Sequence, residues 1–546
     1  MRPRIEASDV VFMYGPDDPK QYDAYGGTVT GWGGRANTLQ ERDLQAFRAL
    51  VNEAQKRKMR YCASVDFLVG FAGFIDFRPE NFMDSVCRDL DGNPLRVPWL
   101  HDHSHKGHPA YWFCTSSPDY RAYLMDQVQR ATIAPVDGLH IDDYRGTSAC
   151  SDWNGGCFCE HCMRAFRDYL KRTGKLSAGE AERFDYRQHL RRQGITAQQY
   201  RQNSWTVPLG AEFQQFQRET VMAVIREVYE KAESIRKKAL LRSVNSSASS
   251  PEALLVEPLV DYFCGEVDHH ASAGSLSAEP VLVYRLVEAF GKRQTATASG
   301  WDWAWIAANE KPGMVRAWVA QAYAFGSVFM VPHNQWCYTQ EKGTHWWKGK
   351  PEDFAFLYRF VREHRELFDG YTSLTNTLME MDEPRFQSAK RLALSMVEAN
   401  IPFAVLYRTP DGRAHRVGTD RLSGYRLLAP DTQSLTSLPD DTRTQLRVES
   451  AGKFLVSVRW RGQAGRRPIV LHLLNRTYNQ QTDSVAPAEV TIHLGNALLR
   501  RAGCTPREAT VLSPDGRTLT VRLRPSRNEV TLEVSSAGLW TVVRLD

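Results

Sequence analysis

Three cysteines crowd into the six-residue run CFCEHC (157–162), directly before a stretch that is typical of a helix (163–172). Zn²⁺ prefers four soft ligands in a tetrahedron, and a C-x-C-x₂-C turn can supply three of them from one tight loop. The fourth ligand could be Cys150, Cys114 or His161, and the spacing does not choose among them. Because a closed set of ligands leaves no position for water, we predict a structural zinc site; buried free thiols are the alternative.

Acidic side chains gather at the ends of two predicted strands. Asp142 and Asp143 end the run GLHIDD (138–143), and Glu266 stands near the end of VDYFCGEV (260–267). A protonated carboxyl group can help a leaving group depart while a charged one attacks or activates water. Alternation along a strand sends Asp142 and Asp143 in opposite directions, so we expect one to project into a pocket and the other to brace the strand end. A loop-bracing Asp143 and a salt-bridged Glu266 are the structural alternatives.

The elements that would position these groups alternate between strand and helix from about residue 8 to 365, which is typical of βα units around a parallel sheet. Eight runs have strand patterns: 10–15, 60–67, 111–116, 138–143, 240–247, 260–267, 293–300 and 326–333. Eight βα units in about 350 residues predict an α/β fold, a (β/α)₈ TIM barrel with insertions, the clearest at 174–202. In such a barrel the chemistry lies where the strands end.

The pattern changes after the predicted helix 352–368. Residues 371–447 keep one amphipathic helix and short strands, which predicts a small α/β domain. From about residue 448 alternating strands and a Pro-Asp-Gly turn at 514–516 predict a C-terminal β-sandwich. We therefore expect domains at 1–370, 371–447 and 448–546, with the two smaller ones supporting packing, assembly or the rim of the site.

The composition limits the partners. The 69 Lys and Arg and the 63 Asp and Glu give a net charge of +6. Spread over 546 residues, this charge is too small to predict nucleic acid or an anionic membrane as a partner. The sequence has no run of about 18 apolar residues, the length that spans a bilayer, and its N-terminus lacks the apolar region of a signal peptide. Because the cysteines cluster as metal ligands do, unlike the disulfide framework of a secreted protein, we expect a reducing, cytoplasmic location. Fourteen Trp and 21 Tyr favour a ligand with both apolar faces and hydroxyls.

Three motifs follow one another in the first half of the chain: YWFCTSSPDYRAYL (111–124), GLHIDDYRG (138–146) and CFCEHCMRAFRDYLKR (157–172). Together they resemble the zinc-binding β-galactosidases of glycoside hydrolase family 42. Further stretches extend the resemblance over most of the chain: 317–336, 400–406 and 425–431. It implies a flavodoxin-like middle domain, an oligosaccharide or glycoside substrate, and compatibility with a homo-oligomer, a trimer or a dimer. The zinc ligands that it implies are Cys114, Cys157, Cys159 and Cys162.

The sequence departs from that family where the family keeps its catalytic residues. An Asn-Glu pair follows the family's fourth strand, whereas this chain has Asp143-Tyr144, and the segment 295–303, where the nucleophilic Glu should fall, holds no Glu. β-Galactosidase activity by that route is therefore not expected. Glycosidic cleavage still needs two carboxyl groups. We predict a glycoside hydrolase with Asp143 as nucleophile or base, Glu266 as acid and Asp142 beside them. The alternative is a catalytically inactive carbohydrate-binding relative.

Aromatic residues follow the seventh and eighth predicted strands. Because the C–H faces of sugars stack on indole rings, we predict that Trp301, Trp303 and Trp336 form a sugar-binding wall, with core packing as the alternative for each. Polar candidates for substrate binding stand near the predicted strand ends: Asp66, Arg145, Asp302 and His333. The His-rich loop 101–108 is expected to be a polar rim of the active site or a solvated loop. Were it to bind a metal, a zinc-dependent hydrolase of another bond would be the third hypothesis.

Overall fold

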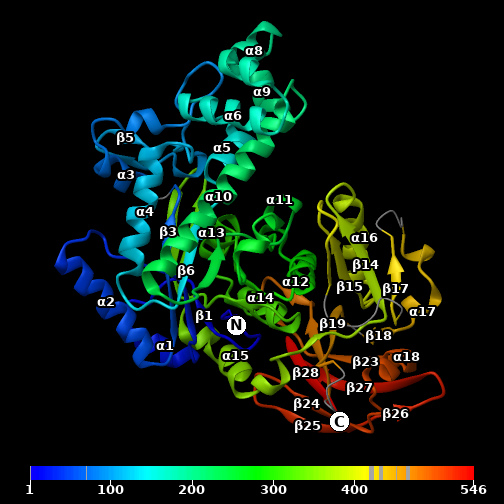
Figure 1. The fold of residues 1–546 in the computed structure, drawn as a ribbon. Coiled ribbons are helices and arrows are strands. Elements are labelled where there is room, and N and C mark those ends of the chain that lie inside the picture. The colour runs from blue at the N-terminus through cyan, green and yellow to red at the C-terminus, as the bar shows by residue number, and fades with distance from the viewer. Residues whose placement is uncertain (1, 69, 417–423, 430–433, 451, 463–467) are drawn as a thin grey trace.

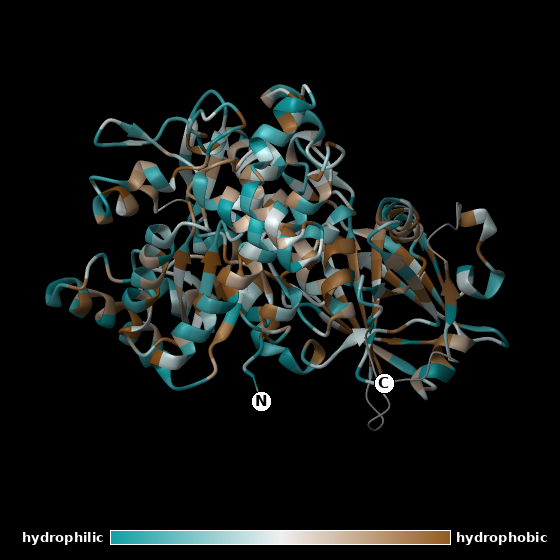
Figure 2. Ribbon diagram, turned by 45° about the horizontal axis from the view of Figure 1, so that its top comes forward, coloured by the Kyte–Doolittle hydropathy of each residue, from teal (hydrophilic) through white to brown (hydrophobic). Residues whose placement is uncertain are grey.

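The computed structural model describes residues 2–68, 70–416, 424–429, 434–450, 452–462 and 468–546 of a mixed α/β protein (Figure 1). Hydrophobic residues concentrate on the central strands and hydrophilic ones on the outer helices (Figure 2). No helix of the described residues is both long and apolar enough to cross a membrane.

Eight parallel strands build the first part of the protein. They form a five-stranded sheet in the order β1-β2-β3-β6-β7 and a three-stranded sheet in the order β10-β9-β8. A parallel bridge between Phe12 and Val331 links β1 to the chain after β10, and the N–H of Asp261 donates to the carbonyl of Arg242 (2.9 Å) between β7 and β8. The strands are β1 (Val11–Phe12), β2 (Val29–Gly33), β3 (Arg60–Asp66), β6 (Gly138–Asp142), β7 (Leu241–Val244), β8 (Phe263–Val267), β9 (Gln294–Ala298) and β10 (Val328–Phe329).

Helices follow most of these strands, at the places where the sequence predicts them. In α4, Ser117 accepts a hydrogen bond from the N–H of Tyr120 and Pro118 occupies the first turn, which is a strong helix start. The helices are α2 (Glu41–Lys56), α4 (Pro118–Thr132), α10 (Gly210–Arg236), α12 (Glu279–Ala289), α14 (Pro312–Ala324) and α15 (Pro351–Glu363). The predicted insertion is helical too, as α7 (Ala178–Arg183), α8 (Tyr186–Arg192) and α9 (Ala197–Asn203).

Two strand predictions were wrong. The second strand is β2, which the sequence hides because glycines interrupt it; a Cβ at Gly33 would lie 2.4 Å from the Tyr61 ring, so only glycine fits. Residues 111–116 form no ladder, and only isolated bridges hold them, Val86 to Phe113 and Arg96 to Tyr111. Asp66 therefore ends the third strand rather than the second, while β6 and β8 keep their predicted fourth and sixth places.

In the described residues beyond α15 there are three larger sheets and a two-stranded one, β21 (Tyr478–Asn479) with β22 (Ser484–Val485). A four-stranded sheet, β16-β15-β14-β17, packs against α16 (Phe386–Glu398); its strands are β14 (Thr377–Asp382), β15 (Ala404–Arg408), β16 (Ala414–Arg416) and β17 (Arg426–Leu428). Two antiparallel sheets follow, β13-β19-β20-β28-β24-β25 and β18-β23-β27-β26, and side chains from both share one buried hydrophobic cluster. Within the predicted stretch 425–431, Pro430 and Asp431 lie outside the described residues.

The strands of the two antiparallel sheets have these bounds: β13 (Thr372–Ser373), β18 (Leu446–Ser450), β19 (Phe454–Trp460), β20 (Ile469–Asn475), β23 (Ala488–Gly495), β24 (Glu508–Leu512), β25 (Thr518–Arg522), β26 (Arg524–Pro525), β27 (Glu529–Ala537) and β28 (Trp540–Leu545). β13 is the first strand after α15, and because it pairs with β19 it is part of the six-stranded antiparallel sheet.

Candidate active site

Three carboxyl groups interact at the carboxyl ends of β6 and β8. Asp142 is the last residue of β6, Asp143 follows it, and Glu266 is the penultimate residue of β8. The charges of Asp142 and Glu266 both raise the pKa of Asp143, and the charge of Asp142 raises that of Glu266. Charges act on one another this strongly only at short range in a partly desolvated site. The two strands therefore bring together the acidic residues that the sequence singles out.

The two neighbouring aspartates have different surroundings. Asp142 Oδ1 accepts hydrogen bonds from Asn245 Nδ2 (2.8 Å) and from the N–H of Asp143 (2.9 Å). Asp143 has a left-handed backbone (φ 48°), and its buried Oδ2 has no hydrogen-bond partner. Burial raises the pKa of Asp142 to about 6 even though the Asn245 hydrogen bond lowers it, and burial raises the pKa of Asp143 well above its usual range. Burial therefore brings the protonation of both carboxyl groups closer to neutral pH than that of exposed aspartates.

Glu266 provides the protonated partner. Burial, and then the charges of Asp142, Asp268 and Asp302, raise its pKa to about 8. Among the described residues no arginine or lysine forms a salt bridge with Glu266. The structural alternative, a Glu266 paired with an arginine, is therefore not what the structure has. At neutral pH Glu266 therefore carries a proton that it can donate.

Tyr14, which sequence reasoning missed, also belongs to this site. It follows β1, and burial raises the pKa of its hydroxyl, followed by the charges of Asp142, Glu266 and Asp143. Its ring makes edge contacts with Trp32 (6.0 Å between centroids) and Trp346 (5.8 Å). The signal was available, because Tyr14 stands at the end of the first predicted strand, as Asp142 does at the end of the fourth.

Two further predicted acidic residues brace loops. Asp302 is 5% exposed, and its carboxylate accepts hydrogen bonds from the N–H groups of His269 (2.8 Å) and Ala271 (2.7 Å) and from the Ser299 hydroxyl. Asp66 is 8% exposed and accepts from Arg35 (2.7 Å) and from the N–H of Gly70. Their oxygens hold the loops after β8 and β3, while the charge of Asp302 acts on Glu266 and that of Asp66 acts on Asp142 and Asp143. Substrate contact by either residue stays a prediction.

The three tryptophans of the predicted sugar-binding wall differ in burial. Residues 300–309 form helix α13 (Gly300–Asn309), in which positions 301 and 303 lie about 200° apart around the axis. Trp301 is 57% exposed, whereas Trp303 is 1% exposed, stacks on Trp347 (5.1 Å) and donates to the Thr297 hydroxyl (2.9 Å). Trp303 is a core residue, which corrects that prediction. Trp336 is half-buried, with its ring against the backbone of Gly300.

The two remaining polar candidates are held by neighbours. Arg145 forms an ion pair with Asp152 and lies over the Trp153 ring (5.2 Å). His333 is 5% exposed, lies 5.0 Å from the Phe12 ring, and burial lowers its pKa to about 4. Neither residue is among the groups whose charges or hydrogen bonds shift the pKa values of Asp142, Asp143 and Glu266. Substrate contact by Arg145 or His333 stays a prediction.

The cysteine cluster lies apart from the carboxyl groups. Its four sulfur atoms are all within 4.8 Å of one another and all four residues are buried: Cys114, Cys157, Cys159 and Cys162. The loop after α5 (Gly146–Asn154) and the start of α6 (Glu160–Arg172) supply three, and the segment before α4 supplies the fourth. Of the candidates left open by spacing, the structure selects Cys114, and Gln217 donates to Cys162 Sγ (3.4 Å). Such a set could hold one metal ion.

The His-rich loop contains no second metal cluster among the described residues. His105 pairs with Asp76 (2.8 Å), and Asp102 accepts the N–H of Thr344 (3.2 Å). His101 lies 3.2 Å from the hydroxyl of Tyr338. The loop thus contacts the hairpin that carries Trp336, as expected of a polar rim.

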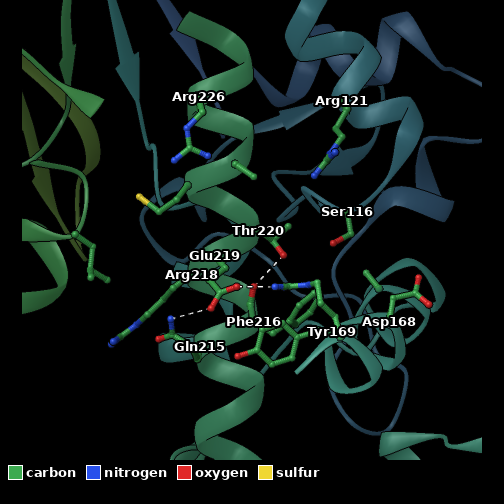
Figure 3. A pocket seen from close by; sticks show the side chains of 15 residues that line it. Ser116, Arg121, Asp168, Tyr169, Gln215, Phe216, Arg218, Glu219, Thr220 and Arg226 are labelled. Atoms are coloured by element: carbon green, nitrogen blue, oxygen red, sulfur yellow. Dashed lines mark hydrogen bonds and ion pairs between the residues drawn. The ribbon is translucent and has the colours of Figure 1, made fainter. Parts of the chain in front are cut away.

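A surface cavity of about 700 Å³ lies elsewhere, between α4, α6 and α10 (Figure 3). Arg121 and Ser116 form one wall and α10 the other, where Glu219 pairs with Arg172 (3.2 Å). None of the carboxyl groups described above lines it.

Comparison with known proteins relates the chain to glycoside hydrolases. No protein-family model matches it. It is 26% identical to an α-agarase of Alteromonas agarilytica over 341 residues, covering 59% of this chain and 23% of that protein. It is 24% identical to an α-agarase of Thalassotalea agarivorans, covering 99% of this chain and 40% of that protein. The chain therefore spans less than half the length of these relatives.

The fold has solved counterparts. A catalytic mutant of a GH42 β-galactosidase from G. stearothermophilus superposes with a TM-score of 0.53 and 10% identity, covering 99% of both chains. At this identity the likeness concerns the fold. It supports the family resemblance as far as a glycoside hydrolase architecture and leaves the specificity of that family unsupported.

Proposed function

We propose that the chain is a glycoside hydrolase that cleaves a glycosidic bond of an oligosaccharide or polysaccharide at the ends of β6 and β8. The observation that carries the proposal is that Glu266 on β8, whose pKa burial raises to about 8, acts on the Asp142–Asp143 pair at the end of β6, where the pKa of Asp142 is about 6. Hydrolysis needs this combination of one acid and one charged carboxyl group. The two α-agarase relatives, glycosidases by name, support it, and the GH42 β-galactosidase structure supports the fold.

Glu266 is the general acid in this proposal: it protonates the oxygen of the leaving sugar. Asp143 is the nucleophile or base: its Oδ2 has no hydrogen-bond partner, and because this oxygen is buried, substrate binding must expose it to the anomeric carbon or to a water molecule. Asp142, held by Asn245, can accept the proton of Asp143, which leaves Asp143 charged for attack or for activation of a water molecule. Tyr14 stays protonated and can donate to a sugar hydroxyl.

The architecture in this proposal is a (β/α)₈ barrel closed by the eight parallel strands, followed by a flavodoxin-like domain and a β-sandwich. The links between β1 and β10 and between β7 and β8 support closure. The shared core of the two antiparallel sheets supports the sandwich.

The four-cysteine cluster holds a structural Zn²⁺ in this proposal. Four buried thiols whose sulfur atoms lie within 4.8 Å of one another fit a closed tetrahedral site. Such an ion would fix the loop before α6 to the segment before α4, and the hydrolysis uses the carboxyl groups alone.

The test is turnover of aryl glycosides and oligosaccharides by the wild type and by Asp143→Asn and Glu266→Gln. Because both curated relatives are α-agarases, agarose and its oligosaccharides come first. Each substitution should lower kcat by several orders of magnitude while circular dichroism stays unchanged. Near-normal rates in one variant would remove that residue from the mechanism. Binding without turnover in the wild type would instead favour the inactive carbohydrate-binding relative.

A further inference from the structure

A hairpin beside the carboxyl groups presents aromatic rings on one face. Its strands are β11 (Gln335–Thr339) and β12 (Gly343–Trp347), and Trp336 pairs directly with Trp346 across them. Residues that face each other in an antiparallel pair lie on the same side, and so does a residue two positions further along. Tyr338 is that residue, and its ring stacks on Trp336 (5.8 Å, 17° between planes).

Each end of this group continues into another ring. The Trp301 ring meets Tyr338 edge-on at 5.0 Å, and the Trp346 ring meets Tyr14 at 5.8 Å. Tyr14 in turn lies where the charges of Asp142, Asp143 and Glu266 act on it. We call these five rings the aromatic stripe: Trp301, Tyr338, Trp336, Trp346 and Tyr14. It runs from the exposed surface to the carboxyl groups.

Two tryptophans of the aromatic stripe are exposed, which costs folding stability. Trp301 is 57% and Trp346 50% exposed, although burying a large aromatic side chain would stabilise the fold by about 1.5–3 kcal/mol. Single exposed apolar residues are ordinary, whereas aromatic rings that contact one another at the surface mark a binding surface. Here Trp336 is half-buried, and Tyr338, which joins it to Trp301, is 5% exposed. Polar groups of the His-rich loop flank it, since His101 lies 3.2 Å from the Tyr338 hydroxyl. Apolar faces beside hydrogen-bonding groups match the surface of a sugar chain.

We infer that the aromatic stripe binds a polysaccharide chain of several sugar units and leads one of its bonds to the carboxyl groups. The inference rests on the proposed function and adds the substrate class, a polymer rather than a small glycoside. A disaccharide over the carboxyl groups would reach Tyr14 but leave Trp301, at the far end, without contact.

The experiment measures kcat/KM of the full chain on agarose-derived oligosaccharides from disaccharide to octasaccharide. Trp301→Ala should lower kcat/KM on the octasaccharide about tenfold, the loss of roughly one stacking contact, and leave the disaccharide unchanged. Trp301→Phe, which keeps a ring, should restore part of the loss. Phe356→Ala removes an exposed aromatic residue (36%, against 57% for Trp301) from α15, outside the stripe, and is the control.

Calorimetric binding of the same series to Glu266→Gln protein separates this inference from the proposed function. Affinity that rises with chain length and falls in the Trp301→Ala background supports the stripe even where no bond is cleaved. Equal losses on short and long substrates, or an octasaccharide affinity that Trp301→Ala leaves unchanged, would overturn it. Failure of every oligosaccharide of the series to bind would overturn it as well.

Discussion

Asn245 donates a hydrogen bond of 2.8 Å to Asp142 and so ties the residue after β7 to the last residue of β6. This bond lowers the pKa of Asp142, which burial raises to about 6. The amide therefore sets the pH at which the aspartate pair takes up its negative charge.

Asn245→Ala should move the acid limb of the pH profile of kcat/KM to higher pH. The wild type should lose activity as the pH falls through about 6, where Asp142 becomes protonated. Without the amide the carboxylate is less stabilised, so protonation occurs at higher pH; a hydrogen bond to a charged group is worth about 1.5–3 kcal/mol, enough to measure. An acid limb at the wild-type position would show that Asp142 does not govern it.

Asp268→Asn should move the alkaline limb in the other direction. Glu266 must be protonated to act as acid, so activity should fall as the pH rises through about 8. The charge of Asp268 contributes to that raised pKa, so removing it lowers the pKa of Glu266 and the limb moves to lower pH. Glu366→Gln, on the segment after α15, changes the net charge equally and should leave the profile in place. Identical limbs in all three proteins would contradict the assignment of Glu266 as acid.

Patterns of period and spacing were enough for most elements and for the acidic cluster. The GLHIDD run predicts β6 and its terminal aspartates because buried parallel strands have continuous apolar sequences. β2 escaped because its glycines, required by the close approach of Tyr61, break that signature. Residues 111–116 have the apolar content of a strand, yet their backbone positions Cys114 in the metal cluster instead.

Side-chain roles were harder to predict than elements. Trp301 and Trp303 look alike in a sequence, and only the helical backbone of α13 exposes one and buries the other. Asp302 reads as a pocket carboxylate, but two backbone N–H groups from the loop after β8 take its oxygens. These contacts join segments far apart in sequence, which local patterns do not encode. Trp346 and Tyr338 could have been found, because period-two alternation around the EKG turn predicts a hairpin.

Metal analysis should find one zinc per chain, held by the cysteine cluster. Cys159→Ser removes one of four thiols that lie within 4.8 Å of one another, so the zinc content should fall and the free energy of unfolding should drop by more than about 4 kcal/mol. Cys504→Ser, a partly exposed thiol of the C-terminal region, should change neither value. Zinc-free protein of wild-type stability would contradict a structural metal.

Arg459→Ala should destabilise the contact between the parallel-strand region and the C-terminal sheets. Arg459, on β19 and 2% exposed, donates to Glu288 of α12 (2.7 Å), whose carboxylate also accepts from the N–H of Ser373 (3.1 Å). Removing Arg459 leaves Glu288 with Arg285 (3.5 Å) as its remaining ion-pair partner, so the cost in urea unfolding should be at most about 3–5 kcal/mol. The exposed pair Arg524–Glu533 is the control, because Arg524→Ala should cost at most about 1 kcal/mol.

The same pair predicts a pH dependence of stability. The pKa of Glu288 is lowered against the penalty of burial, with Arg459 as the first of the groups that lower it. A lowered folded-state pKa contributes stability that is present above the unfolded value of 4.5 and is lost as the pH falls through the folded value. Arg459→Ala should therefore flatten the acid limb of the unfolding free energy as well as lower the plateau. A plateau within about 1 kcal/mol of the wild type would mean that the ion pair does not stabilise this contact.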